Sequence, residues 1–309
     1  MGKKINMKLR TKDMKILIVG CNGHVGQEIV KKAVIREMDI RCFDLNPLNI
    51  PNLDTSSLDC VTGDITDPAA VRRVIKDVDA VIDVIGMRGE TKTLTHEMVE
   101  HGGIKNIIQA GKENGVKHIL YTSVLGVEPN SPARTLSAKW NAEQSLMQSG
   151  IPHTIFRPSG YFVDFAEYFA PKIRDTGSFT VIGNGLTRLQ PLDPADLAEA
   201  FIQSLDNEKA VNRLFKIGGP EVFTLLEVID LVSKIVDRKV KIKKFPFWIM
   251  NIMFSVIAFL TGKKGGKDFL YRMSRDSVCS DQEMREVKDA FTIEFNRLEP
   301  WLREKTNQS

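Results

Sequence analysis

One stretch with three glycines, VGCNGHVG, does most to limit what this chain can fold into. It separates an apolar run suited to a buried strand (residues 14–20) from a segment with helical spacing (24–38). At such a junction one glycine permits a tight turn, one lets a pyrophosphate approach the backbone, and one lets helix and strand pack closely. The alternative is a turn that only joins the two elements. Because a helix N-terminus attracts negative charge, the spacing of Gly20, Gly23 and Gly26 predicts a dinucleotide-binding loop.

The first two thirds of the chain alternate strand-like and helix-like patterns. Apolar runs rich in β-branched residues recur after the first one, and segments with helical periodicity lie between them. This alternation predicts an α/β fold with a doubly wound parallel sheet, because crossover helices join parallel strands on both faces. The further strands are predicted at residues 39–46, 58–67, 79–86, 116–126 and 152–162, and the helices at 68–77, 94–114 and 132–149.

An aspartate, Asp44, ends the second predicted strand about twenty residues after the loop. A carboxylate at this place accepts hydrogen bonds from the adenine ribose hydroxyls and repels a 2′-phosphate, so NAD is favoured over NADP. The nearby Arg41 lies three residues away, and strand alternation puts its side chain on the opposite face. A plain strand-end carboxylate is the alternative. Asp64 and Ile65 are expected beside the adenine, and Gly86 where the backbone passes the cofactor.

The composition excludes several classes of protein. A hydrophobic content of 42% and a charged content of 27% are typical of a soluble globular chain. A net charge of +4, from 43 basic and 39 acidic residues, is too small to predict nucleic-acid binding. The four cysteines have no CxxC spacing and no paired histidines, so neither a metal site nor a disulfide framework is predicted. A cytoplasmic location is therefore expected.

An uncharged apolar segment, FPFWIMNIMFSVIAFLTG (245–262), has lysines on both sides. As a helix its 18 residues would be about 27 Å long, whereas a typical membrane span has ~20 residues. Two interpretations remain open. The segment is either a buried helix that closes a substrate lobe or makes a homodimer contact, or an in-plane helix that attaches the protein peripherally to anionic lipid.

The order of motifs resembles the short-chain dehydrogenases/reductases, in their atypical and extended branch with NmrA-like and epimerase-like members. The resemblance implies a Rossmann-type sheet with a smaller C-terminal substrate lobe. It implies a dinucleotide-binding domain at residues 14–160, completed by about 190–218, and a substrate-binding lobe at 161–189 and 219–309. The motifs that carry it are GCNGHVG, GDITD, GIKNIIQAGKENGVKHILYTSVLGV, SAKWNAEQSLMQSGIPHTIFRPSGYF and LQPLDPADLAEAF.

The resemblance also points to an active site. In this family a serine or threonine after the fifth strand, a tyrosine, and a lysine four residues later work together. Ser123 and Lys139 match the first and the last, but Thr135 occupies the tyrosine position. Threonine cannot act as an acid near neutral pH. Some atypical members work with the lysine alone, and others do no chemistry.

Three residues are therefore candidates for catalysis. Lys139 would stabilise developing negative charge or bind the nicotinamide ribose, or only be an exposed helix lysine. Ser123 would donate a hydrogen bond to the substrate oxygen, or only end a strand. Tyr161 would replace the missing phenol, or only pack. The predicted cofactor contacts are Gly20, Asn22, Gly23, His24, Val25, Gly26, Asp44, Asp64, Ile65, Ile85, Gly86, Lys139 and Pro158.

The predicted function is that of an NAD(P)-dependent oxidoreductase. It would transfer hydride to a carbonyl or conjugated double bond of a hydrophobic small molecule, with NAD as the cofactor and NADP as the second choice. The alternative is a non-catalytic NAD(P)-binding sensor or assembly factor, which Thr135 favours.

Overall fold

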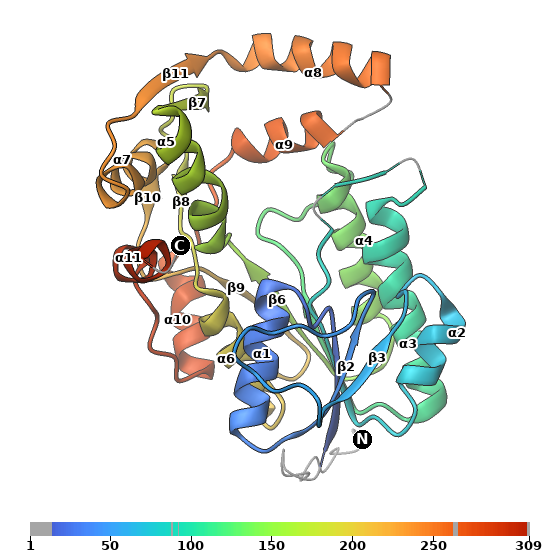
Figure 1. Ribbon diagram of the computed structural model, residues 1–309. Coiled ribbons are helices and arrows are strands. Elements are labelled where there is room, and N and C mark those ends of the chain that lie inside the picture. Colours follow the sequence, from blue (N-terminus) through green and yellow to red (C-terminus); the bar gives the residue numbers. More distant parts are fainter. Residues whose placement is uncertain (1–13, 88, 92, 262–264, 308–309) are drawn as a thin grey trace.

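A seven-stranded parallel sheet organises the chain, and helices cover both of its faces (Figure 1). The computed structural model describes residues 14–87, 89–91, 93–261 and 265–307. The strand order is β3-β2-β1-β4-β5-β6-β9, and every neighbouring pair is parallel. The strands are β1 (Lys15–Val19), β2 (Asp39–Asp44), β3 (Asp59–Thr62), β4 (Ala80–Asp83), β5 (His118–Thr122), β6 (His153–Pro158) and β9 (Arg213–Ile217).

The helices form two layers around this sheet. The layer formed by α1 and α6 and the layer formed by α2, α3 and α4 enclose separate hydrophobic cores, one on each face. This confirms the predicted doubly wound α/β fold. The helices of the two layers are α1 (His24–Ile35), α6 (Pro194–Ser204), α2 (Pro68–Val74), α3 (Gly103–Asn114), which the π-helix η2 (Glu97–Gly102) precedes, and α4 (Arg134–Met147).

The central strands explain why the sheet is buried on both faces. Every residue of β4 and of β5 is buried, as expected for runs that are mostly apolar rather than alternating. The strand order reverses direction between β1 and β4, so the crevice at their carboxyl ends is the place where such sheets bind ligands.

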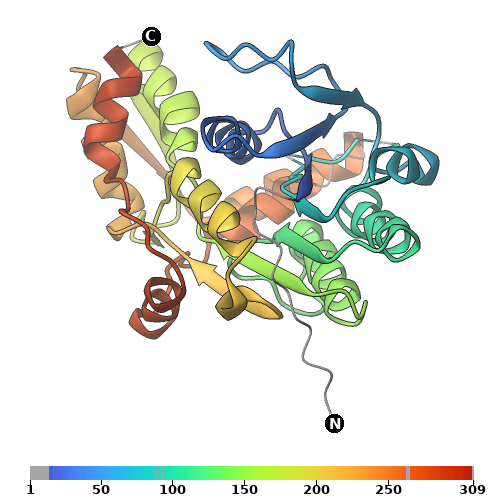
Figure 2. The same ribbon diagram turned by 90° about the horizontal axis from the view of Figure 1, so that it is seen from below.

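A smaller third core lies beside the sheet, and Figure 2 shows its helices on one flank. Within it β7 pairs with β11, and β8 pairs with β10. Its elements are η3 (Phe165–Phe169), α5 (Ala170–Thr176), β7 (Ser178–Ile182), β8 (Arg188–Leu189), β10 (Phe223–Thr224), α7 (Leu225–Ile235), β11 (Lys241–Phe245) and α11 (Leu298–Asn307).

Three further helices belong to the C-terminal third. Helices α8 (Phe247–Thr261) and α9 (Gly265–Met273) lie beyond the carboxyl ends of the strands in Figure 1. Helix α10 (Asp281–Ala290) packs instead on β9, and its Val287 joins the core around α1 and α6. Part of the range assigned to the lobe (219–309) therefore covers the nucleotide domain, because an amphipathic helix packs wherever an apolar sheet face remains open.

Candidate functional site

The glycine loop has a backbone that side chains would not permit. Gly20 has a φ of +86°, in the left-handed region that favours glycine. A Cβ on Gly26 would lie 2.1 Å from the carbonyl oxygen of Gly20, and a Cβ on Gly23 would lie 3.3 Å from the same atom. Helix α1 begins at His24, directly after Gly23, so its first N–H groups face the loop without a capping side chain. The loop therefore fits a pyrophosphate.

Asp44, the last residue of β2, contacts this loop. One carboxylate oxygen of Asp44 accepts a hydrogen bond from the backbone N–H of Asn22 at 3.0 Å. The Asn22 side chain donates to the carbonyls of Asn46 and Pro47, which holds the loop against the segment after β2. Arg41 points the other way, where it bonds Asp59 at 2.8 Å. No arginine from β2 is thus aimed at the Asp44 end to receive a 2′-phosphate.

The residues predicted beside the adenine lie after β3. Asp64 accepts a hydrogen bond from the N–H of Thr66 at 2.8 Å, and the carbonyl of Ile65 accepts one from Asn106 at 2.9 Å. The buried Ile65 side chain packs on Gly103, where an added Cβ would lie 2.8 Å away. A hollow of about 280 Å³ opens directly beside them, lined by Thr66, Met98, Gly102, Lys105 and Asn106.

The chain after β4 connects the loop to the rest of the site. The backbone N of Ile85 would be 3.1 Å from a Cβ on Gly20, so no larger residue than glycine fits beneath it. Ile85 also offers its carbonyl to the ammonium of Lys139 at 3.4 Å. Gly86 is exposed, and an added Cβ there would meet nothing within 4 Å. Val25 and Pro158, by contrast, are buried at the ends of the loop and of β6.

Lys139 is half of a buried ion pair. Its side chain lies on α4 and is 5% exposed, and its Nζ donates to Glu100 Oε2 at 2.6 Å and to the Thr122 carbonyl at 2.9 Å. Glu100, on η2, also accepts the N–H of Met87 at 3.1 Å. Burial raises the pKa of Glu100, but the charge of Lys139 and these hydrogen bonds outweigh it and leave the pKa below its usual range. Glu100 is therefore a carboxylate at neutral pH.

Two more ionisable side chains border this pair. Burial raises the pKa of Asp83, at the end of β4, to about 7, against the hydrogen bond from the Ile85 N–H and the charge of Lys139. Burial and the nearby Glu100 raise the pKa of Tyr121 well above its usual value, so its phenol, 3.5 Å from Lys139 Nζ, stays protonated. Of these groups, Asp83 is the one that exchanges a proton near neutral pH.

The position of the family tyrosine contacts a histidine. The Thr135 hydroxyl lies 2.7 Å from Nε2 and 3.0 Å from Nδ1 of His96, and both residues are buried. His96 in turn lies 3.9 Å from Glu100. A line of polar contacts thus runs from Thr135 through His96 to the ion pair of Lys139.

The carboxyl end of β5 leaves two hydroxyls free. Ser123 is 3% exposed and Thr122 is 7% exposed, and the side-chain oxygen of each has no hydrogen-bond partner among the described residues. A buried hydroxyl without a partner costs about 1–3 kcal/mol. Native proteins rarely leave such groups unexplained, and a bound ligand would supply the missing hydrogen bond.

Two other predicted residues lie apart from this group. Burial and Asp164 raise the pKa of Tyr161, so its phenol is a weak acid, and its ring packs against the core around α1. The imidazole of His24 lies 3.2 Å from Glu167 on η3, which links the start of α1 to the third core. The contact of His24 with the cofactor phosphate stays a prediction.

The sequence interpretation missed three members of the site: Asp83, His96 and Glu100. Asp83 had a visible signal, since it is the one charged residue in the apolar run VIDVIG. The spacing of His96 and Glu100, four residues apart, places both on one helical face, but it does not identify their partners on α4.

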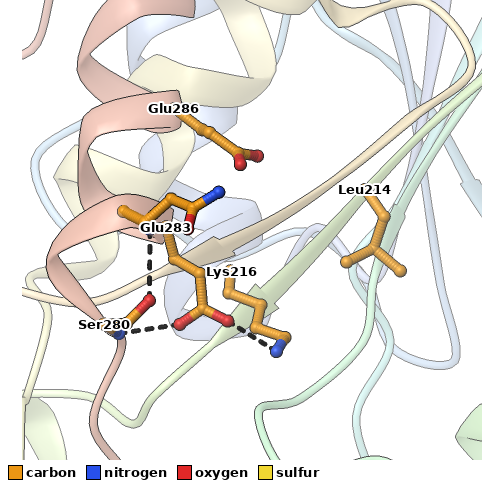
Figure 3. Close-up of a pocket in the computed structure, with 6 residues that line it drawn as sticks. Leu214, Lys216, Ser280, Glu283 and Glu286 are labelled. Atoms are coloured by element: carbon orange, nitrogen blue, oxygen red, sulfur yellow. Dashed lines mark hydrogen bonds and ion pairs between the residues drawn. The ribbon is translucent and has the colours of Figure 1, made fainter.

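The hollow in Figure 3 lies elsewhere, between β9 and α10. It encloses about 290 Å³ and is lined by Leu214, Lys216, Ser280, Gln282, Glu283 and Glu286. Lys216 bonds Glu283 at 2.6 Å, and Ser280 and Glu283 cap the start of α10, so these groups satisfy one another. Among the described residues, no three His, Cys, Asp or Glu side chains are grouped to hold a metal ion.

The titration of Asp83 predicts a pH effect on stability. The pKa of this carboxyl is raised from 3.8 to about 7 on folding. Between pH 3.8 and 7 it is therefore protonated in the folded state and mostly ionised in the unfolded state. The wild type should therefore lose stability as pH rises through this range, by at most about 4 kcal/mol. Asp83→Asn should lack this loss. Urea unfolding of both proteins at pH 4, 5.5 and 7 measures it, and parallel curves would contradict the assignment.

Comparison with known proteins agrees with this geometry. A family model described as NAD(P)H-binding matches residues 20–208, more than half of the chain. The photosystem II assembly factor Ycf39 of Trieres chinensis is 25% identical over 308 residues, which cover 94% of this chain and 96% of that protein. The NAD(P)H azoreductase of Xenophilus azovorans is 25% identical over 73% of this chain and 75% of its own.

A solved structure gives the same fold. The NADPH-dependent quinone oxidoreductase of Escherichia coli, crystallised with NADPH, has a TM-score of 0.75 and 19% identity. The match covers 94% of this chain and 100% of that one.

Proposed function

The chain belongs to the NAD(P)H-binding family, and from this we propose that it is a reductase. It would transfer hydride from NAD(P)H to a carbonyl or conjugated double bond of a hydrophobic small molecule. Its relatives include a protein named as an azoreductase, and its structural neighbours include a quinone oxidoreductase, both of which act on conjugated acceptors by their names.

The residues of the glycine loop would hold the cofactor. The N–H groups at the start of α1 would bind the pyrophosphate, and Asp44 would accept hydrogen bonds from the adenine ribose. The bound dinucleotide supplies the hydride, and the protein positions it and stabilises the charge that builds on the acceptor. Asp44 favours NADH, because a 2′-phosphate would meet its carboxylate.

The observation that carries this proposal is the pair of unpartnered hydroxyls on Thr122 and Ser123. They lie at the carboxyl end of β5, where a parallel sheet of this kind binds its ligands. Ser123 would donate a hydrogen bond to the acceptor oxygen as it gains negative charge. A chain that only bound the adenine half of a dinucleotide would have no use for buried free hydroxyls at this place.

The ion pair would shape the electrostatics of the same place. The ammonium of Lys139 is fixed by Glu100 and by the Thr122 carbonyl, one residue before Ser123. Its charge would therefore act on the acceptor through space rather than by direct proton donation. Asp83, with a pKa of about 7, is a proton store near neutral pH.

We expect Ser123→Ala to lower kcat for an accepted substrate about 100-fold, as the loss of one hydrogen bond to a developing oxyanion typically does. The free protein should become more stable, by up to about 1–3 kcal/mol, because the variant removes a buried hydroxyl that has no partner among the described residues. The assay follows NADH oxidation with a panel of quinones and enones. Ser204→Ala is the matched control, since Ser204 is also buried but donates to Ala200 within α6 at 2.7 Å.

The outcome also decides the second candidate function. Thr135 provides no acid, and Lys139 is occupied by Glu100, which favours a dinucleotide-binding assembly factor such as the relative named Ycf39. If the wild type binds NADH but does not oxidise it with any acceptor of the panel, this result supports the assembly-factor role. Equal kcat in Ser123→Ala and wild type would remove Ser123 from the reaction.

A further inference from the structure

Helix α8 exposes most of its apolar side chains. Trp248 is 65% exposed, Leu260 is 73% exposed and Phe259 is 89% exposed. Apolar side chains gathered on one surface of a soluble chain mark a place of interaction. The large exposed apolar residues of the helix are Trp248, Ile249, Ile252, Met253, Val256, Ile257, Phe259 and Leu260.

The side of α8 that packs against the protein is narrower than its exposed side. Phe247 packs on Gly183, where an added Cβ would lie 2.4 Å from its ring, and Phe254 packs in the same way on Gly266 of α9. Met250 is 9% exposed between them. These three residues are spaced so that they lie on one face of the helix, which points toward the protein. The other faces of the helix point outward. The interpretation of this segment as a helix buried in a substrate lobe is therefore wrong, whereas the homodimer contact stays a prediction. Gly262, the last residue of the segment, lies outside the described residues.

The helix is too short to span a bilayer. Its 15 residues reach about 22 Å, whereas the hydrocarbon core is about 30 Å thick. Among the described residues, no helix is long and apolar enough to cross a membrane. An apolar helix of this length that lies on a surface is suited to the interface, with its axis in the membrane plane.

The strand before α8 supplies the matching charge. All five residues of β11 are exposed, and they include Lys241, Lys243 and Lys244. The ammonium groups of these lysines form no ion pair with a described residue. Lysines beside an apolar surface are attracted to anionic headgroups, and Trp248 beside them is the side chain that prefers the headgroup level.

We propose that β11 and α8 together bind the surface of an anionic lipid bilayer. The outer side chains of α8 enter the interface, and the lysines of β11 contact the headgroups. Helix α9, beneath α8, joins this surface to the candidate site, because Asp268 accepts the N–H of Arg134 at 3.2 Å, one residue before Thr135. The bound protein would turn the carboxyl edge of its sheet toward the membrane (Figure 1).

Vesicle flotation of the full chain tests this proposal without any activity assay. The protein should float with phosphatidylcholine vesicles that contain phosphatidylglycerol, and not with phosphatidylcholine alone. The Lys241→Gln, Lys243→Gln, Lys244→Gln triple variant should bind about 100-fold more weakly, from the loss of three charges near the surface. High salt should weaken the wild type in the same way.

A second variant separates the apolar contribution. Trp248→Ser with Ile252→Ser should abolish flotation, whereas Ile35→Ser should not, because Ile35 is 80% exposed at the C-terminal end of α1 and belongs to neither β11 nor α8. Two results together would overturn the proposal: the wild type does not float at low salt, and it sediments as a dimer that the double variant dissociates. The outer face of α8 would then bind a second copy of the chain.

Discussion

Replacing Lys139 by methionine should lower the free energy of unfolding by about 3–5 kcal/mol, because it leaves Glu100 charged and unpaired in the interior. Methionine keeps most of the side-chain volume, so the effect reports the lost charge rather than a cavity. Glu100 is 2% exposed and would keep one hydrogen bond, from the N–H of Met87. Chemical denaturation of wild type and variant at pH 7 measures the difference.

Three comparisons isolate the buried charge. Lys234→Met removes a lysine from an exposed pair with Asp230, and should change stability far less than Lys139→Met does. The double variant Lys139→Met with Glu100→Gln should recover much of the loss, because no unpaired charge remains. Without Lys139 the pKa of Glu100 rises, so the defect should shrink as pH falls and Glu100 becomes protonated. A loss as small as that of Lys234→Met would show that the pair is solvated.

The fold was predictable because its signals are local. The glycine loop and the apolar runs of β4 and β5 each specify an element from a few neighbouring residues, and the crossover rule then fixes the sheet. The assignment of the C-terminal third was less accurate. The sequence of α10 shows an amphipathic helix, but not that its apolar face meets β9.

The candidate site was predictable only in its cofactor half. Gly26 and Asp44 belong to a motif whose spacing reflects backbone geometry, so sequence reveals them. The partner of Lys139 is Glu100, 39 residues earlier, and a glutamate on a helix is usually solvated. Nothing local distinguishes this buried glutamate from an exposed one. The ribose contact of Lys139 stays a prediction, although its ammonium already has protein partners.

The apolar segment shows a different limit. Its composition indicates a surface that avoids water, yet the same composition suits a core helix and an interfacial one. What decides between them is whether other elements cover the helix. Among the described residues, α9 and the turn at Gly183 pack against its inner side chains, and most of its apolar side chains stay exposed.

Gly26→Ala should abolish measurable binding of NADH, or weaken it at least about 100-fold. The new Cβ would lie 2.1 Å from the Gly20 carbonyl oxygen and 2.8 Å from the Cys21 Cα, and both are backbone atoms that no rotamer change can move. The start of α1 must shift away from the loop, which misplaces the N–H groups that face the pyrophosphate by about an ångström. Titration calorimetry with NADH measures the loss.

A control glycine separates this effect from general damage. Gly111→Ala also adds a Cβ inside a helix, but its contacts to Val116 and Ile151 begin at 3.4 Å, so binding should be unchanged. The same titration with NADPH tests Asp44: the wild type should bind NADH roughly tenfold more tightly, a difference of about 1.4 kcal/mol. Asp44→Ser should reduce this preference, because the repelling carboxylate is gone while an oxygen remains for the ribose. Unchanged NADH affinity in Gly26→Ala would mean that the dinucleotide does not lie on this loop, since its backbone cannot both accept that Cβ and keep its present shape.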